Sequence, residues 1–215
     1  MALIREFLSE IDAKWKPIGG EPILLQVIGS AALMLQCDYE RGTKDGDVLE
    51  AKDGPPALKE KLISVAGKKS DLCKQFRVYI DVVNRAILFL PQQPVFHPLP
   101  SLPLKNFRIE VLDIGDVVLS KLKRYNSDDK NDIRAMADKN LLDHGRLVAR
   151  FKAAADWFSV DARAADVPRY LKNLHAVERD ILAVDALPLA ERTYNTLSAG
   201  EQQRVLVARA LASEA

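Results

Sequence analysis

A Gly-Ser pair in the first half of the sequence has the setting of a phosphate-binding turn. The strand-like run ILLQVI (23–28) ends at Gly29-Ser30, and the helix-forming run AALMLQC (31–37) follows directly. The first turn of a helix presents backbone N–H groups that have no partner within the helix, and these groups attract phosphate. Glycine allows a ligand to approach the backbone closely, and the Ser30 hydroxyl adds a hydrogen bond. Gly29 and Ser30 are therefore predicted to bind phosphate.

Three acidic residues have the spacing of a magnesium site. Asp45 and Asp47 lie on a predicted strand, 45–51, and alternation places both carboxylates on one face. Two neighbouring carboxylates repel each other unless a cation is present, and Mg²⁺ is bound by one or two carboxylates together with substrate phosphates. Asp81 lies within the apolar run VYIDVV, where an acid needs a metal, a base or an arginine as partner.

These acids also have simpler structural interpretations. Asp-Gly is a favoured turn pair, so Asp45-Gly46-Asp47 could form a hairpin turn instead of a metal-binding strand. Asp81 could form a structural ion pair with Arg77 or Arg85.

The combination of Gly29-Ser30, Asp45-x-Asp47 and Asp81 resembles the nucleotidyltransferase superfamily, which has the fold of DNA polymerase β. The resemblance implies that Gly29 and Ser30 contact a nucleoside triphosphate and that Asp45 and Asp47 bind Mg²⁺. It also implies that Asp81 completes the metal site and activates an acceptor hydroxyl.

The residues before the first acid add to this resemblance. Arg41, Thr43 and Lys44 are similar to a lead-in that is common in the superfamily, which implies that Thr43 helps to bind the nucleotide. The sequence departs from the family pattern at Gly46, where an apolar residue is usual, and glycine loosens a strand.

A second segment, VVLSKLKRYNSDDKNDIRAM (117–136), is similar to proteins related to the AbiEii-type abortive-infection toxins. The matching residues are Lys121, Arg124, Asp129 and Asp132. Lys121 and Arg124 are three residues apart and share a helix face, so they could hold the polyphosphate. They could instead form an ordinary solvated face, which spacing alone favours, and the two acids could favour the first turn of their helix through its dipole. The resemblance implies a toxin–antitoxin or phage-defence setting and an antitoxin partner.

The elements that must position these residues form a predicted α+β protein, with a small mixed β-sheet core followed by a helical C-terminal portion. The division falls between residues 1–112 and 113–215. The predicted helices cover 2–16, 31–37, 55–66, 113–125, 128–140, 145–158, 166–183 and 198–213. The predicted strands are 23–28, 45–51, 107–113 and a hairpin of 76–83 with 86–90, and the proline-rich residues 91–103 form an extended loop or an edge strand.

The C-terminal segment TLSAGEQQRVLVARALASEA (196–215) is similar to the signature segment of ABC-transporter ATPases. An ATPase of that class needs a Gly-x-x-x-x-Gly-Lys-Ser/Thr loop, and Gly67-Lys68-Lys69-Ser70 does not complete one. A capping box of Ser198 and Glu201 at the start of a helix is a sufficient physical explanation. The segment is therefore predicted to be a capped helix.

Composition, charge and cysteine spacing exclude several classes of protein. The 215 residues include 31 Lys and Arg and 30 Asp and Glu, a net charge of +1, which excludes coating of nucleic acid by bulk charge. No apolar run reaches the roughly 18 residues of a membrane span. Cys37 and Cys73 lie far apart and suit neither a disulfide scaffold nor a metal knuckle. We therefore expect a reduced, cytoplasmic protein without a membrane partner.

The expected activity is Mg²⁺-dependent transfer of a nucleotidyl group from a nucleoside triphosphate to an acceptor hydroxyl, on RNA or on a protein. The alternative is a catalytically inactive protein that keeps the nucleotidyltransferase fold and binds a nucleotide or a protein.

Overall fold

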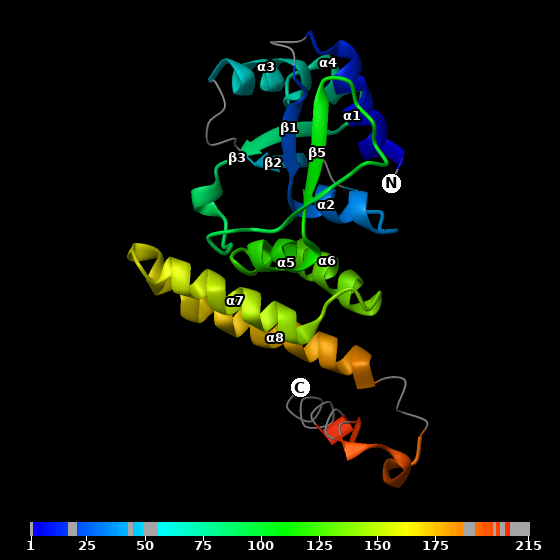
Figure 1. The fold of residues 1–215 in the computed structure, drawn as a ribbon, viewed down its shortest axis with the longest axis vertical. Helices are drawn as coiled ribbons and strands as arrows, with labels where there is room; N and C mark the ends of the chain where they lie inside the picture. Colours follow the sequence, from blue (N-terminus) through cyan, green and yellow to red (C-terminus); the bar gives the residue numbers. More distant parts are fainter. Residues whose placement is uncertain are drawn as a thin grey trace. The chain divides into compact units, whose positions relative to one another are not determined.

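The chain forms two compact units, Met1–Ser120 and Lys121–Ala215. The computed structural model describes residues 2–16, 21–42, 45–49, 56–186, 192–199, 201–202 and 205–206. The first unit holds a β-sheet with helices, and the described part of the second unit is helical (Figure 1). The predicted α+β class, with a mixed sheet followed by helices, is confirmed.

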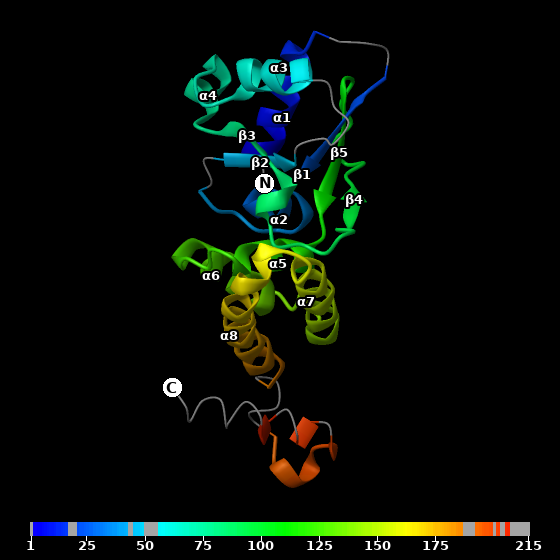
Figure 2. The same cartoon turned by 90° about the vertical axis from the view of Figure 1, so that its left-hand side faces the viewer.

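A mixed sheet with the strand order β3-β2-β1-β5-β4 forms the centre of the first unit. Its strands are β1 (Ile23–Val27), β2 (Asp45–Leu49), β3 (Tyr79–Val83), β4 (Phe96–Pro98) and β5 (Phe107–Leu112). β1 is parallel to β5 and antiparallel to β2, which in turn is parallel to β3. Strand β4, from the proline-rich stretch, pairs antiparallel with β5 as an edge strand, beside which it lies in Figure 2.

The two faces of this sheet differ in polarity because side chains alternate along each strand. One face is apolar and buried, and its residues include Leu25, Val27, Val48, Ile80, Phe107, Ile109 and Val111. Helix α1 (Ala2–Lys14) begins the element order, and Trp15, just after it, meets Phe107 edge-on with ring centroids 4.9 Å apart. By register and alternation, the other face, named here the polar face, carries Gln26, Asp45, Asp47, Tyr79, Asp81, Arg108 and Glu110, together with the apolar residues Leu24, Leu49 and Val83.

Three further helices of the first unit are α2 (Gly29–Gln36), α3 (Pro56–Ala66) and α4 (Asp71–Phe76). The first two match the predicted helices 31–37 and 55–66. Helix α4 was not among the predicted elements, and its last residue, Phe76, begins the predicted strand 76–83. Ser70 caps this helix by accepting a hydrogen bond of 3.0 Å from the backbone N–H of Cys73, which turns the chain into a helix before β3.

The predicted hairpin of 76–83 with 86–90 is wrong. Asn84 accepts a hydrogen bond of 2.8 Å from the backbone N–H of Ala86 and starts a short 3₁₀ turn, Arg85–Ile87, where the second strand was expected. Strand β3 instead lies parallel to β2, and parallel neighbours need a crossover, which α3 and α4 provide.

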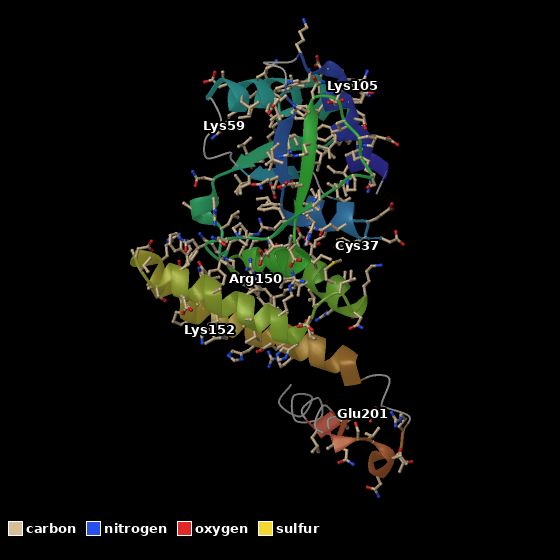
Figure 3. All side chains as sticks on the ribbon, viewed as in Figure 1. Cys37, Lys59, Lys105, Arg150, Lys152 and Glu201 are labelled. Atoms are coloured by element: carbon tan, nitrogen blue, oxygen red, sulfur yellow. The ribbon has the colours of Figure 1, made fainter. Side chains whose placement is uncertain are left out.

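The second unit contains the end of α5 (Ile114–Leu122) and the helices α6 (Ser127–Asp138), α7 (His144–Phe158) and α8 (Val167–Ala186), which confirm the predicted helices in this region. Figure 3 labels Arg150 and Lys152 on α7. Asn126 and Asp129 form a capping box at α6, and Asp143 caps α7. In the described part of the chain, no helix combines the length and apolarity that crossing a membrane requires.

The predicted capping box in the C-terminal segment is confirmed. The backbone N–H of Ser198 donates to Glu201 Oε2 at 2.7 Å, and that of Glu201 donates to Ser198 Oγ at 3.4 Å. These bonds, with the nearby Arg192, lower the pKa of Glu201 to about 2. Most of the predicted helix 198–213 lies outside the described residues.

Candidate functional site

The N-terminus of α2 has the character of an anion-binding turn. Ile28 is its N-cap residue and makes no side-chain capping bond, and Gly29 has a φ of +63°, which side chains rarely tolerate. Arg41 donates a hydrogen bond of 3.2 Å to Ser30 Oγ, which adds a guanidinium to the first turn. Backbone N–H groups, a hydroxyl and a guanidinium therefore meet at the start of α2. Thr43 lies outside the described residues.

Strand pairing brings Asp47 to this turn. The backbone N–H of Ile28 donates to the carbonyl of Asp47 at 2.9 Å, in the antiparallel pairing of β1 with β2. A Cβ atom added to Gly29 would lie 2.7 Å from Asp47 Oδ2, closer than real Cβ atoms approach another atom. The Asp47 carboxylate thus lies against Gly29, and any side chain there would displace it.

The other two predicted acids lie on the same face of the sheet as Asp47. Asp45 is two residues earlier on β2, and Asp81 on β3 is the register partner of Asp47. Asp45 and Asp47 are half-buried, and Asp81 is exposed. Because Asp45-Gly46-Asp47 forms a paired strand, the hairpin-turn interpretation of these residues is wrong.

Asp81 forms no ion pair with Arg77 or Arg85, and all three residues lie in the described part of the chain. Arg85 donates instead to the carbonyl oxygens of Pro91 and Gln92. Arg77 ends α4 in a left-handed conformation, with a φ of 55°. Asp81 is exposed, so water can solvate its carboxylate, and the expectation that an acid in this strand needs a partner is wrong.

The donor chemistry of this face suits a hard divalent cation. Mg²⁺ takes one or two carboxylates from a protein and completes its octahedron with water and phosphate oxygens. Asp45 and Asp47 offer two such carboxylates beside a phosphate-binding turn, so the residues fit the ion. Among the described residues, no group of three His, Cys, Asp or Glu side chains is arranged to hold a metal ion.

Tyr79 is a residue of this face that sequence reasoning missed. It is the register partner of Asp45. Burial raises the pKa of the Tyr79 phenol, and the charges of Asp45, Asp81 and Asp47 raise it further. Lys68 Nζ, from the turn between α3 and α4, lies 5.8 Å from the centroid of the Tyr79 ring. The available signal was the two-residue spacing between Tyr79 and Asp81, which places both on one face of a strand.

Gly46, the departure from the family pattern, lies on the buried face. A Cβ atom there would lie 3.3 Å from Ile80 Cδ1 and 3.7 Å from Ile4 Cδ1. Ile80 and Ile4 thus come close to the position that a side chain would occupy. The strand keeps a close-packed core beneath the two acids despite the glycine.

The predicted phosphate ligands of the second unit form a charge cluster with the two acids of α6, in which Lys121 and both acids are buried and Arg124 is exposed. Lys121 Nζ lies 2.7 Å from Asp132 Oδ2 and 3.2 Å from Asp129 Oδ1, and Arg124 Nε lies 2.8 Å from Asp129 Oδ2. Lys121 is only 5% exposed, so it does not belong to a solvated helix face. A role of Lys121 and Arg124 in phosphate binding stays a prediction.

Asp129 is the centre of this cluster. It is fully buried and occupies the third position of the α6 capping box, as expected of an acid in a first turn. Burial by itself would raise the pKa of Asp129, but the hydrogen bonds and charges of Arg124 and Lys121 lower it overall. The carboxylate is therefore held ionised inside the unit.

No curated protein and no solved structure gives a significant match. One family profile, described as "Nucleotidyltransferase of unknown function (DUF6036)", matches residues 6–177, most of the chain. This match supports the resemblance to the nucleotidyltransferase superfamily, whereas the AbiEii-related subgroup stays a prediction. The chain belongs to the DUF6036 family of nucleotidyltransferases.

Proposed function

We propose that the protein transfers a nucleotidyl group from a nucleoside triphosphate to an acceptor hydroxyl, with Mg²⁺. One observation carries the proposal: the carboxylate of Asp47 lies against Gly29 at the start of α2. A turn that attracts phosphate and a carboxylate that repels it are compatible neighbours when a divalent cation lies between ligand and acid. Membership of a nucleotidyltransferase family supports the same conclusion.

In the first unit, different residues bind the triphosphate and the metal ion. The N–H groups at the start of α2, the Ser30 hydroxyl and the Arg41 guanidinium hold the triphosphate. Asp45 and Asp47 would hold Mg²⁺, which would supply positive charge against the negative charge that develops on the phosphates. Because Gly29 has no side chain, the phosphate-binding turn and the Asp47 carboxylate can lie close together.

The reaction forms one phosphorus–oxygen bond and breaks another. The acceptor oxygen attacks the α-phosphorus, the bond between that phosphorus and the α–β bridging oxygen breaks, and pyrophosphate leaves. Asp81, exposed and in register with Asp47, accepts the proton of the acceptor hydroxyl as general base. An exposed base suits an acceptor that arrives from solvent.

The biological setting that we propose rests on the resemblance to AbiEii-related proteins. We include RNA and protein as acceptors, and a toxin–antitoxin or phage-defence role with an antitoxin partner.

The test is a transfer assay with each nucleoside triphosphate labelled at the α-phosphate, in the presence of Mg²⁺ and either total bacterial RNA or bacterial protein extract. The label should enter one acceptor class with the wild type, and Asp47→Asn should abolish transfer. Asp71→Asn is the matched control, because Asp71 is an exposed acid of α4 paired with Lys74. Transfer that survives in Asp47→Asn would contradict the proposal.

A second candidate is an inactive relative that binds a nucleotide or a protein. The observation that favours it is the absence, among the described residues, of a group of three side chains arranged to hold a metal ion. This candidate predicts nucleotide binding with no label transferred to either acceptor class. The same assay, combined with a binding measurement, therefore separates the two candidates.

A further inference from the structure

The aromatic ring of Tyr79 lies on the polar face of the sheet rather than in the apolar core. Tyr79 begins β3 and is the register partner of Asp45, one of the two proposed Mg²⁺ ligands. It is half-buried, whereas its neighbour Ile80 points to the other face and is only 3% exposed. Tyr79 therefore lies beside the carboxylates of Asp45, Asp47 and Asp81 and on the opposite face from the apolar core of the sheet.

A lysine holds the ring from one side. Lys68 Nζ lies 5.8 Å from the ring centroid and comes from the turn between α3 and α4, and it is exposed. A cation at this distance is attracted to the ring face. The ring therefore lies between the strand that carries the acids and a positively charged turn.

The position of Tyr79 relative to α2 fits the dimensions of a nucleotide. Strands β1, β2 and β3 are consecutive in the sheet, and neighbouring strands lie about 4.8 Å apart, so β3 is about 10 Å from β1. The proposed triphosphate site lies where β1 ends, and Tyr79 lies across β2 from it. A nucleoside triphosphate can span this interval with its phosphates at α2 and its base at β3.

We infer that Tyr79 is the surface on which the base of the nucleoside triphosphate stacks. The inference rests on the proposed function and adds a residue that contacts the substrate. Stacking on an aromatic ring tolerates every base, because every base has a π-face. Tyr79 therefore contributes affinity for the nucleoside part of the substrate, and the phosphates are held elsewhere.

The test compares a ligand that has a base with one that has none. The probes are ATP, CTP, GTP and UTP, each with Mg²⁺, and inorganic tripolyphosphate with Mg²⁺, titrated calorimetrically into the full chain. Tyr79→Leu should weaken binding of the preferred nucleoside triphosphate about 5- to 150-fold and leave tripolyphosphate affinity unchanged. Tyr79→Phe, which keeps the ring, should bind within about twofold of the wild type. Phe96→Leu, on the opposite edge strand β4, is the matched control and should change neither affinity.

Two results would overturn the inference while leaving the proposed function intact. One is that Tyr79→Leu and the wild type bind every nucleoside triphosphate with equal affinity. This result would overturn the inference even if the variant changed the use of the acceptor. The other is an equal loss for tripolyphosphate, because Tyr79 would then act through the phosphates or the fold. If the wild type binds tripolyphosphate and no nucleoside triphosphate more tightly, the base contact is refuted. If it binds none of the probes, the proposed function itself fails.

Discussion

Two clusters of acidic residues in this protein differ in the burial of their carboxylates and in the cations beside them. On α6, Asp129 and Asp132 are fully buried, and the ammonium of Lys121 lies within 3.2 Å of both. On the sheet, Asp45 and Asp47 are half-buried and Asp81 is exposed, all on one polar face beside the N-terminus of α2.

The difference separates a structural cluster from a site that can accept a ligand. A buried carboxylate is tolerated only when a cation and hydrogen bonds accompany it, and removing the cation leaves the charge uncompensated. Carboxylates on a solvent-accessible face keep part of their hydration and can exchange water for a metal ion. We therefore expect substitutions in the helical cluster to act on stability and substitutions on the sheet to act on ligand binding.

The largest effect on stability should follow Lys121→Met. This change leaves Asp132 buried without the ammonium that lies 2.7 Å from it, and we expect a loss of about 3–5 kcal/mol in the free energy of unfolding, measured by urea denaturation. Lys152→Met, on the exposed surface of α7 (Figure 3), is the matched control and should stay within about 0.5 kcal/mol of wild type.

The double variant Lys121→Met with Asp132→Asn removes charge from both partners and should recover part of that loss. A single variant as stable as the Lys152→Met control would show that the buried cluster does not need its cation.

Gly29→Ala should have the next largest effect, and it should act on both stability and binding. The φ of +63° makes alanine unfavourable by about 1–2 kcal/mol, and the added Cβ would displace the Asp47 carboxylate. The same experiment with Gly42→Ala provides the control, because a Cβ there meets no atom within 4 Å. If both variants retain Mg²⁺-dependent nucleotide binding, the contact between Gly29 and Asp47 is not needed for it.

Acid should weaken the helical cluster. The folded pKa of Asp129 is lowered relative to the unfolded chain, so its stabilising contribution is present above the unfolded pKa of about 3.9 and is lost as the pH falls through the folded value. We expect the free energy of unfolding of the wild type to fall more steeply than that of Asp129→Asn below about pH 4. Equal slopes over pH 5 to pH 2 would contradict this assignment.

The smallest effect should follow Gly46→Ala. The new Cβ would meet the flexible end of Ile80 at 3.3 Å, and the gain from replacing glycine within a strand, about 0.5–1 kcal/mol, should offset that close contact. Unfolding free energy should therefore change by less than about 1 kcal/mol, and nucleotide binding should be retained. A strong loss of stability would mean that Ile80 and Ile4 cannot yield to a side chain at this position.

Much of the site could be predicted from the sequence because its signals are local. The turn at Gly29-Ser30 and the alternation of Asp45 and Asp47 each depend on neighbouring residues, and the structure has a helix start and a strand at these places. Asp81 was placed on a strand correctly, although the partner of that strand was not foreseen.

The parts that could not be predicted depend on long-range pairing. Residues 76–83 and 86–90 have the composition of a hairpin, yet β3 pairs with β2, which lies about thirty residues earlier and is reached through α3 and α4. The same non-local pairing places Tyr79 beside Asp45. Burial of Lys121 likewise results from packing against α6, which helix spacing alone does not reveal.

The most direct test of the central claim is the thermal stability of the protein with each nucleoside triphosphate, with and without Mg²⁺, for the wild type, Asp47→Asn and Asp71→Asn. A ligand at 100 times its dissociation constant adds about 2.7 kcal/mol, a rise of about 5–10 °C for a chain of this size. We predict such a rise in the wild type and in Asp71→Asn only when nucleotide and Mg²⁺ are both present, and none in Asp47→Asn. A rise that persists in Asp47→Asn, or no rise in the wild type with any nucleotide, would contradict a Mg²⁺–nucleotide site at Gly29 and Asp47.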